Sequence, residues 1–153
     1  MRPFKVLVPI DLSPSSLQIL DFALSRERLG GAEFTLLYVV PSGEVETFAS
    51  LGGGPEEGFS KIRKEALVRL EKEARNRSGG EGAPDIVCRV SAGVPFREIC
   101  RLAEDESFDL IVLGTHGRTG LPHLLLGSNA ERVVQHASCP VLSVTPRVLR
   151  GED

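Results

Sequence analysis

The chain has 153 residues, a usual size for one domain, and its 41% hydrophobic and 25% charged residues are typical of a globular protein. The formal net charge of −3 and the pI near 5.7 argue against broad electrostatic attraction to nucleic acid or to an anionic membrane surface. Any phosphate group that the protein binds must therefore be held by local features of a single domain, residues 1–153.

The N-terminal segment contains the first predicted strand, Phe4 to Val8, and no export signal. Its apolar run is short, because Asp11 ends it before a signal-peptide core can form, and no stretch of the chain reaches transmembrane length. We therefore expect a cytoplasmic protein. An odd number of cysteines also fits a disulfide framework poorly, so we assign three reduced thiols to packing: Cys88, Cys100 and Cys139.

The first predicted helix follows this strand. Ser13 is a good N-cap, Pro14 suits the first helical position, and leucines recur at helical spacing until Gly30-Gly31 ends the helix. Apolar residues at helical spacing predict three further helices, from Phe59 to Ala74, from near Pro95 and from near Ser128.

Four more short runs rich in β-branched residues are predicted to be strands, and several of them are almost entirely apolar. Such strands are buried on both faces, as in a parallel sheet between two layers of helices. The alternation of strands and helices predicts an α/β fold with a doubly wound, five-stranded parallel sheet and helices on both faces. The four runs are Glu33 to Val40, Asp85 to Val90, Leu110 to Leu113 and Val141 to Thr145.

Two connections are rich in glycine. The segment from Pro41 to Gly58 is long for a link between a strand and a helix, so it is either a functional flap or a disordered segment. The run from Ser78 to Pro84 has the composition of a flexible linker within the domain.

A glycine-rich turn follows the fourth predicted strand. Glycines recur at every third residue, and a Gly-Ser pair comes directly before the last helix: Gly114, Gly117, Gly120, Gly127 and Ser128. Glycines leave backbone N–H groups accessible, and a helix N-terminus adds unpaired donors with a positive dipole end. Together they predict an anion site that needs no net positive charge. The spacing is neither that of a Walker P-loop nor that of the dinucleotide-binding fingerprint.

Several polar residues near this turn and the first strand also suit roles that need no ligand. Ser128 and Glu131 have the spacing of a capping box, which satisfies donors at a helix start without any bound molecule. Asp11 has the alternative role of orienting the turn before Ser13. No metal site is predicted, because paired C-x2-C or H-x3-H spacing is missing among the three cysteines and His116, His123 and His136.

The pattern G-x2-G-x9-G-S/T, met by Gly114, Gly117, Gly127 and Ser128, resembles the nucleotide-binding signature of the ATP-binding branch of the universal stress protein family. KVLVPIDLSPSS resembles the opening strand and turn of that family, and HASCPVLSV resembles its closing helix and strand. The resemblance implies the strand order 3-2-1-4-5, which places the first and fourth strands side by side. Ligands of such sheets bind beyond the carboxyl ends of the strands at that point.

The resemblance also implies a site. Pro9, Ile10 and Asp11 should face adenine and ribose, with the Asp11 carboxylate accepting hydrogen bonds from the ribose hydroxyls, and Val40 should flank the adenine. Two segments should hold the phosphates, namely Gly114, Thr115, His116, Gly117, Arg118 and Gly120 in the turn, and Gly127, Ser128, Asn129 and Ala130 at the helix start. Asn129 replaces the small apolar residue expected there, so its amide either contacts the terminal phosphate or a water molecule, or crowds the phosphate.

The leading functional prediction is an ATP-binding regulatory protein of the stress response, which binds ATP with or without Mg²⁺ and is at most a weak ATPase. His116 is the only candidate general base in the glycine turn. One alternative is a small adenylating enzyme of related fold, although the chain lacks an SGGxDS-type loop. The other is a dimeric interaction module without functional nucleotide binding.

A homodimer is also predicted. The fifth strand should lie at a sheet edge with Val141, Leu142 and Val144 and without a proline or lysine that would block pairing. Antiparallel pairing of two copies about a two-fold axis would remove the exposed edge. The alternative is that the tail from Pro146 to Asp153 covers it.

Overall fold

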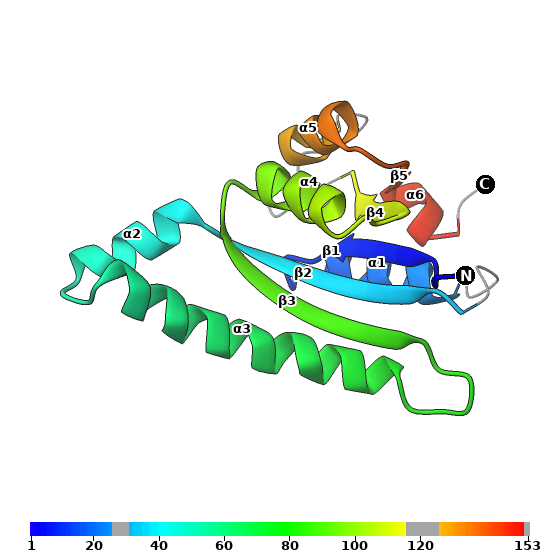
Figure 1. The fold of residues 1–153 in the computed structure, drawn as a ribbon, viewed down its shortest axis with the longest axis horizontal. Coiled ribbons are helices and arrows are strands. Elements are labelled where there is room, and N and C mark those ends of the chain that lie inside the picture. Colours follow the sequence, from blue (N-terminus) through cyan, green and yellow to red (C-terminus); the bar gives the residue numbers. More distant parts are fainter. Residues whose placement is uncertain (26–30, 116–125, 152–153) are drawn as a thin grey trace.

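The structure, a computed structural model, describes residues 1–25, 31–115 and 126–151 and is built around a parallel β-sheet (Figure 1). Within these residues the sheet has five strands in the order β3-β2-β1-β4-β5, so the predicted α/β class and strand order are confirmed. Neighbouring strands are parallel throughout. The strands are β1 (Lys5–Pro9), β2 (Glu33–Pro41), β3 (Asp85–Gly93), β4 (Leu110–Gly114) and β5 (Val141–Val144).

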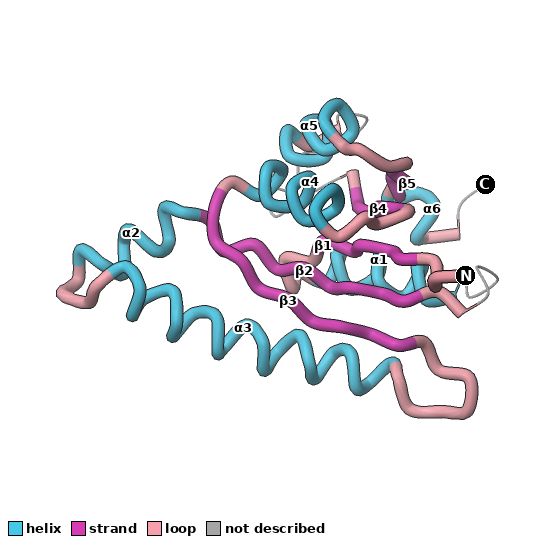
Figure 2. Tube along the Cα trace, viewed as in Figure 1, coloured by secondary structure: helices cyan, strands magenta, loops and turns pink. Residues whose placement is uncertain are grey.

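Helices cover both faces of the sheet (Figure 2). They are α1 (Pro14–Ser25), α2 (Ser42–Ser50), α3 (Pro55–Arg77), α4 (Pro95–Asp105), α5 (Ser128–His136) and α6 (Pro146–Leu149). The predicted cap of α1 is present, since Ser13 Oγ accepts a hydrogen bond of 3.2 Å from Ser16 N. None of the helices in the described part of the chain combines the length and the apolar character that a membrane crossing requires.

The core consists of two apolar layers, one on each face of the sheet. Alternate residues of β1 enter opposite layers, because successive side chains of a strand point to opposite faces. Val6 and Val8 pack with Leu70 in the layer beneath α1 and α3, whereas Leu7 packs with Ile99 in the layer beneath α4 and α5. The central strands are thus apolar on both faces, as the sequence predicts.

The segment from Pro41 to Gly58 is not disordered, so that part of the prediction is wrong. Residues 42–58, which we call the arm, form α2, a turn and the beginning of α3. Phe48 packs against the glycines of this hairpin so closely that a Cβ on Gly58 would lie 2.6 Å from its Cδ1 atom. In Figure 1 the arm extends beyond the carboxyl ends of β2 and β3.

The start of the chain is tied to the connection between α4 and β4. The Arg2 guanidinium donates two hydrogen bonds of 2.7 Å to the Asp109 carboxylate, which also accepts one of 2.9 Å from Lys5 N. The bond from Arg2 is the main reason why the pKa of Asp109 is lowered from its ordinary value. At the other end of the chain, Leu149 of α6 packs against the layer beneath α1.

Candidate functional site

A cavity of about 310 Å³ opens at the carboxyl ends of β1 and β4. These two neighbouring strands form the topological switch point, where the order of the strands in the sheet reverses. The structure brings together nine residues predicted for the site around this cavity: Pro9, Ile10, Asp11, Gly114, Thr115, Gly127, Ser128, Asn129 and Ala130. Four more predicted residues, His116, Gly117, Arg118 and Gly120, lie outside the described part of the chain.

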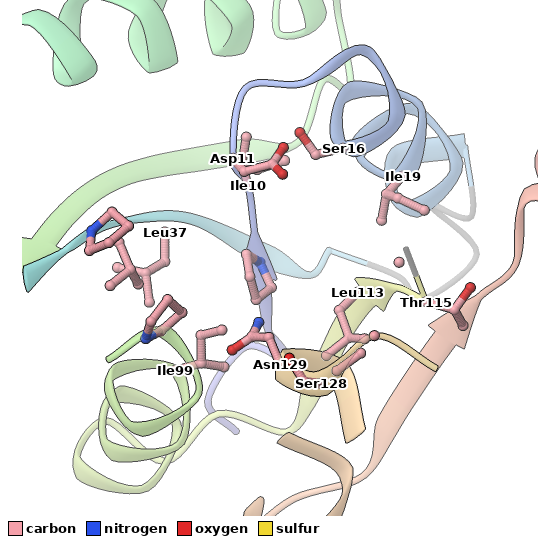
Figure 3. A pocket seen from close by; sticks show the side chains of 17 residues that line it. Ile10, Asp11, Ser16, Ile19, Leu37, Ile99, Leu113, Thr115, Ser128 and Asn129 are labelled. Carbon is pink, nitrogen blue, oxygen red and sulfur yellow. The ribbon is translucent and has the colours of Figure 1, made fainter. Parts of the chain in front are cut away.

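One end of the cavity is apolar. Leu37 and Ile99 face it from β2 and α4 (Figure 3), and three more residues complete this wall, namely Val39, Pro41 and Pro95. Sequence reasoning missed all five. The order of the strands contained a signal for some of them, because β2 lies beside β1 and its last residues must end at the same edge of the sheet.

Val40, which was expected to flank a base, does not line the cavity. It is fully buried in the layer beneath α1 and α3. Its neighbour Val39 lines the cavity instead. Because side chains alternate along a strand, an error of one residue moves the prediction to the wrong face of the sheet.

The backbone of β2 also contributes to the apolar end. Ile10 N donates a hydrogen bond of 2.9 Å to Leu37 O, and the register of β1 with β2 ends at Pro9 and Leu37. In a parallel strand, the N–H and C=O of every second residue point toward the same neighbouring strand. The N–H and C=O of Val39 are therefore directed to the side where β1 has ended, which offers one donor and one acceptor to a planar polar ring.

The other end of the cavity is the beginning of α5. Glu131 N donates the first hydrogen bond of this helix, at 2.9 Å, to Gly127 O. The N–H groups of Ser128, Asn129 and Ala130 come before that bond and have no acceptor within the helix. No side chain of the described residues caps α5, so these donors can meet an anion at the positive end of the helix dipole.

The capping-box interpretation of Ser128 is wrong. Ser128 occupies the first helical position, and the N-cap is Gly127. The φ of −56° and ψ of 150° at Gly127 are accessible to any residue, so the backbone does not require glycine there. Gly127 lines the cavity, and its N–H donates a hydrogen bond of 2.7 Å to Thr115 O.

Asp11 lies at the turn between β1 and α1. Its Oδ1 accepts a hydrogen bond of 2.9 Å from Ser13 N, so the alternative role of ordering this turn is confirmed. The chain bends at Leu12, whose φ of 63° is in the left-handed region. The Asp11 side chain also lines the cavity beside Ser16 (Figure 3), a residue that sequence reasoning missed. The turn thus fixes a carboxylate at the cavity wall.

The three cysteines pack against the two core layers. Burial raises the pKa of the Cys88, Cys100 and Cys139 thiols, which favours their neutral form. Their assignment to packing agrees with this environment. Among the described residues, no group of three His, Cys, Asp or Glu side chains is placed to hold a metal ion.

Comparison with known sequences gives a consistent result. The sequence model of the universal stress protein family matches residues 4–145. The chain is 38% identical over 143 residues to universal stress protein MJ0531 of Methanocaldococcus jannaschii, covering 92% of this chain and 81% of that protein. It is 32% identical over 151 residues to universal stress protein MJ0577 of the same organism, covering 92% and 93% of the two chains.

Solved structures show the same similarity. The structure of MJ0577 has a TM-score of 0.78 and 29% sequence identity, covering 95% of this chain and 97% of that chain. A universal stress protein solved in complex with cAMP has a TM-score of 0.58 and 26% identity, covering 95% and 98% of the two chains. A nucleotide is therefore bound by at least one protein that this chain resembles.

Proposed function

The chain belongs to the universal stress protein family, and from this premise we propose that it is a regulatory protein of the stress response that binds ATP. The observation that carries the proposal is the polarity of the cavity. One end is apolar and offers the peptide group of Val39, and the other end offers the unpaired N–H groups of α5. A nucleotide has the matching polarity, with a flat base at one end and phosphates at the other.

The apolar end suits a purine. The faces of the base would lie against the apolar wall, which includes Leu37, Ile99, Pro41 and Pro95. The polar edge of the base would meet the backbone donor and acceptor of Val39. The cavity volume of about 310 Å³ is at the lower end of the range for small-molecule sites. The Asp11 carboxylate, between the two ends, would accept hydrogen bonds from the ribose hydroxyls.

The phosphates would lie at the beginning of α5, where three N–H groups and the helix dipole act in the same direction. Asp11 is the only carboxylate among the described residues that line the cavity. Mg²⁺ is commonly bound through one or two carboxylates together with substrate phosphates, so a Mg²⁺ ion here would be held mainly by ATP and water. We propose ATP as the ligand, with or without Mg²⁺, and at most slow hydrolysis.

Calorimetric titration of ATP into the parent protein and into Gly127→Val tests the proposal. A valine side chain would occupy the space beside the N–H donors, and each hydrogen bond to a charged phosphate contributes about 1.5–3 kcal/mol, so we expect a loss of affinity of at least about tenfold. Gly43→Val is the matched control, since nothing lies within 4 Å of the Cβ position of Gly43. Circular dichroism shows whether each variant is folded.

A folded Gly127→Val that binds ATP like the parent would replace the proposal with the interaction-module alternative. Titration with AMP and cAMP separates a triphosphate site from a site for a shorter nucleotide, because of the three ligands only ATP carries β- and γ-phosphates. Mass spectrometry of the denatured protein identifies any nucleotide that purifies with it. The cytoplasmic location and the homodimer remain predictions.

A further inference from the structure

Four side chains between α4 and α5 form what we call the basic patch: Phe96, Arg97, Arg132 and His136. The guanidinium carbons of Arg97 and Arg132 lie 5.7 and 5.1 Å from the centre of the Phe96 ring, within the range of a cation–π contact. The centre of the His136 ring lies 5.7 Å from the same point. None of these residues lines the cavity. The patch therefore gathers two permanent positive charges around one aromatic ring outside the nucleotide site.

The fold itself does not account for these charges. Arg97 stands in the first turn of α4, where the helix dipole disfavours a cation. Arg101, one turn further on, bridges Glu98 and Asp105. By contrast, no ion pair among the described residues includes Arg97 or Arg132. Two unpaired guanidinium groups on one ring form a surface that suits carboxylates of a partner.

The arm has the opposite charge. Residues 42–58 contain four exposed glutamates, Glu44, Glu46, Glu56 and Glu57, and no lysine or arginine. α2 contributes no buried residue, and Leu51 at the end of the arm is 82% exposed. The arm is nevertheless an ordered hairpin because Phe48 packs on its glycines. An acidic, partly apolar element thus extends from the molecule without a large buried surface of its own (Figure 1).

We propose that the arm of a second copy of this chain docks on the basic patch. The glutamates of the arm face Arg97 and Arg132, and Leu51 adds an apolar contact that the exposed arm lacks in a single chain. Each copy carries both surfaces, so two copies related by a two-fold axis make the contact twice and the assembly closes. This association does not depend on nucleotide binding or on pairing between β5 strands.

Sedimentation equilibrium of the full chain at low ionic strength tests the proposal, with Leu142→Lys in every variant to suppress pairing of β5 edges. Arg97→Glu with Arg132→Glu should raise the dissociation constant of self-association by about tenfold or more, and Glu56→Lys with Glu57→Lys should do the same. When all four changes are combined, the new lysines of the arm again face groups of opposite charge, the new glutamates of the patch. They should return the dissociation constant to within about threefold of the Leu142→Lys parent.

Arg63→Glu with Arg69→Glu is the matched control, because it makes the same change of charge on α3, where no aromatic contact of these arginines is present among the described residues. Equal weakening by the control would overturn the proposal. So would a Leu142→Lys parent that stays monomeric at all concentrations, or a combined variant that does not recover. If circular dichroism shows that the Arg97→Glu, Arg132→Glu variant is unfolded, the variant Arg97→Ala with Arg132→Ala replaces it. This variant must also weaken self-association.

Discussion

Two neighbouring valines of β2 face opposite sides of the sheet, so their replacement should have separable effects. Val39→Phe would fill the apolar end of the cavity and should weaken ATP binding by about tenfold or more with little change in stability. Val40→Ala removes apolar volume from a fully buried position and should lower the free energy of unfolding by about 2 kcal/mol with unchanged affinity. Calorimetric titration and urea unfolding of both variants measure the two effects. Loss of affinity in Val40→Ala, or loss of stability without loss of affinity in Val39→Phe, would contradict the assignment of Val39 to the cavity and Val40 to the core.

Asp11 orders the turn before α1 and has a proposed role in binding ribose, and one pair of variants separates the two. Asp11→Asn keeps an oxygen that can accept the hydrogen bond from Ser13 N but loses the charge, so we expect near-parent thermal stability and about tenfold weaker ATP binding. Asp11→Ala loses the acceptor as well and should also be less stable. Thermal unfolding with calorimetric titration compares them. Parent-like binding by a folded Asp11→Asn would remove the ribose role.

The sequence predicted which segments reach the site better than it predicted which side chains face the cavity. β2 is apolar on both faces, so no polar residue marks which valine faces the cavity, and the prediction names Val40 where the structure has Val39. Ser128 had the spacing of a capping box, but Gly127 takes the N-cap position. In both cases the predicted residue lies one position away from the residue that has the role in the structure. The exact position depends on packing in three dimensions and not on composition.

Among the elements, the arm differs most from expectation. Its three consecutive glycines and low apolar content are typical of a loop, and α2 has no buried residue that would produce a helical apolar stripe. The strands and the other helices that were predicted carry apolar residues at their own period, and α1 and α4 also begin at a proline. What the sequence did not indicate is a contact between Phe48 and two glycines.

Gly58 is a test of that contact. Alanine normally stabilises a helix relative to glycine by about 0.5–1 kcal/mol, but here the added Cβ would lie 2.6 Å from Cδ1 and 3.0 Å from Cγ of Phe48. Gly58→Ala should therefore open the hairpin and speed amide hydrogen exchange of α2 without changing exchange in the sheet. Gly43→Ala, with nothing within 4 Å of its Cβ position, is the control and should leave exchange of α2 equal or slower. Slower exchange in Gly58→Ala would show that the ring does not hold the arm.

At the scale of the whole molecule, the burial of the β5 side chains decides which residue can test the predicted pairing of β5 edges. Val144 is 2% exposed and packs in the core, so a lysine at this position would unfold the protein. Leu142 on the same strand is 43% exposed. Leu142→Lys should lower the mass observed by sedimentation in a folded protein, because it removes the β5 contact and leaves only the contact between the arm and the basic patch, whereas Val87→Lys, at an exposed valine of the opposite edge strand, should not. A parent protein that is monomeric at micromolar concentration would refute the pairing.

The central position of β1 has a consequence for synthesis of the chain. β1 leaves the ribosome before β2 and β4, and its pairing with β4 joins Val6 to Leu110, whereas its pairing with β2 joins Val6 to Phe34. The half-sheet of β1, β2 and β3 can therefore form while one side of β1 still has unpaired N–H and C=O groups. Until β4 is made, the nascent chain exposes the middle of its future sheet. The cavity, which needs both β1 and β4, can form only after β4 has been translated.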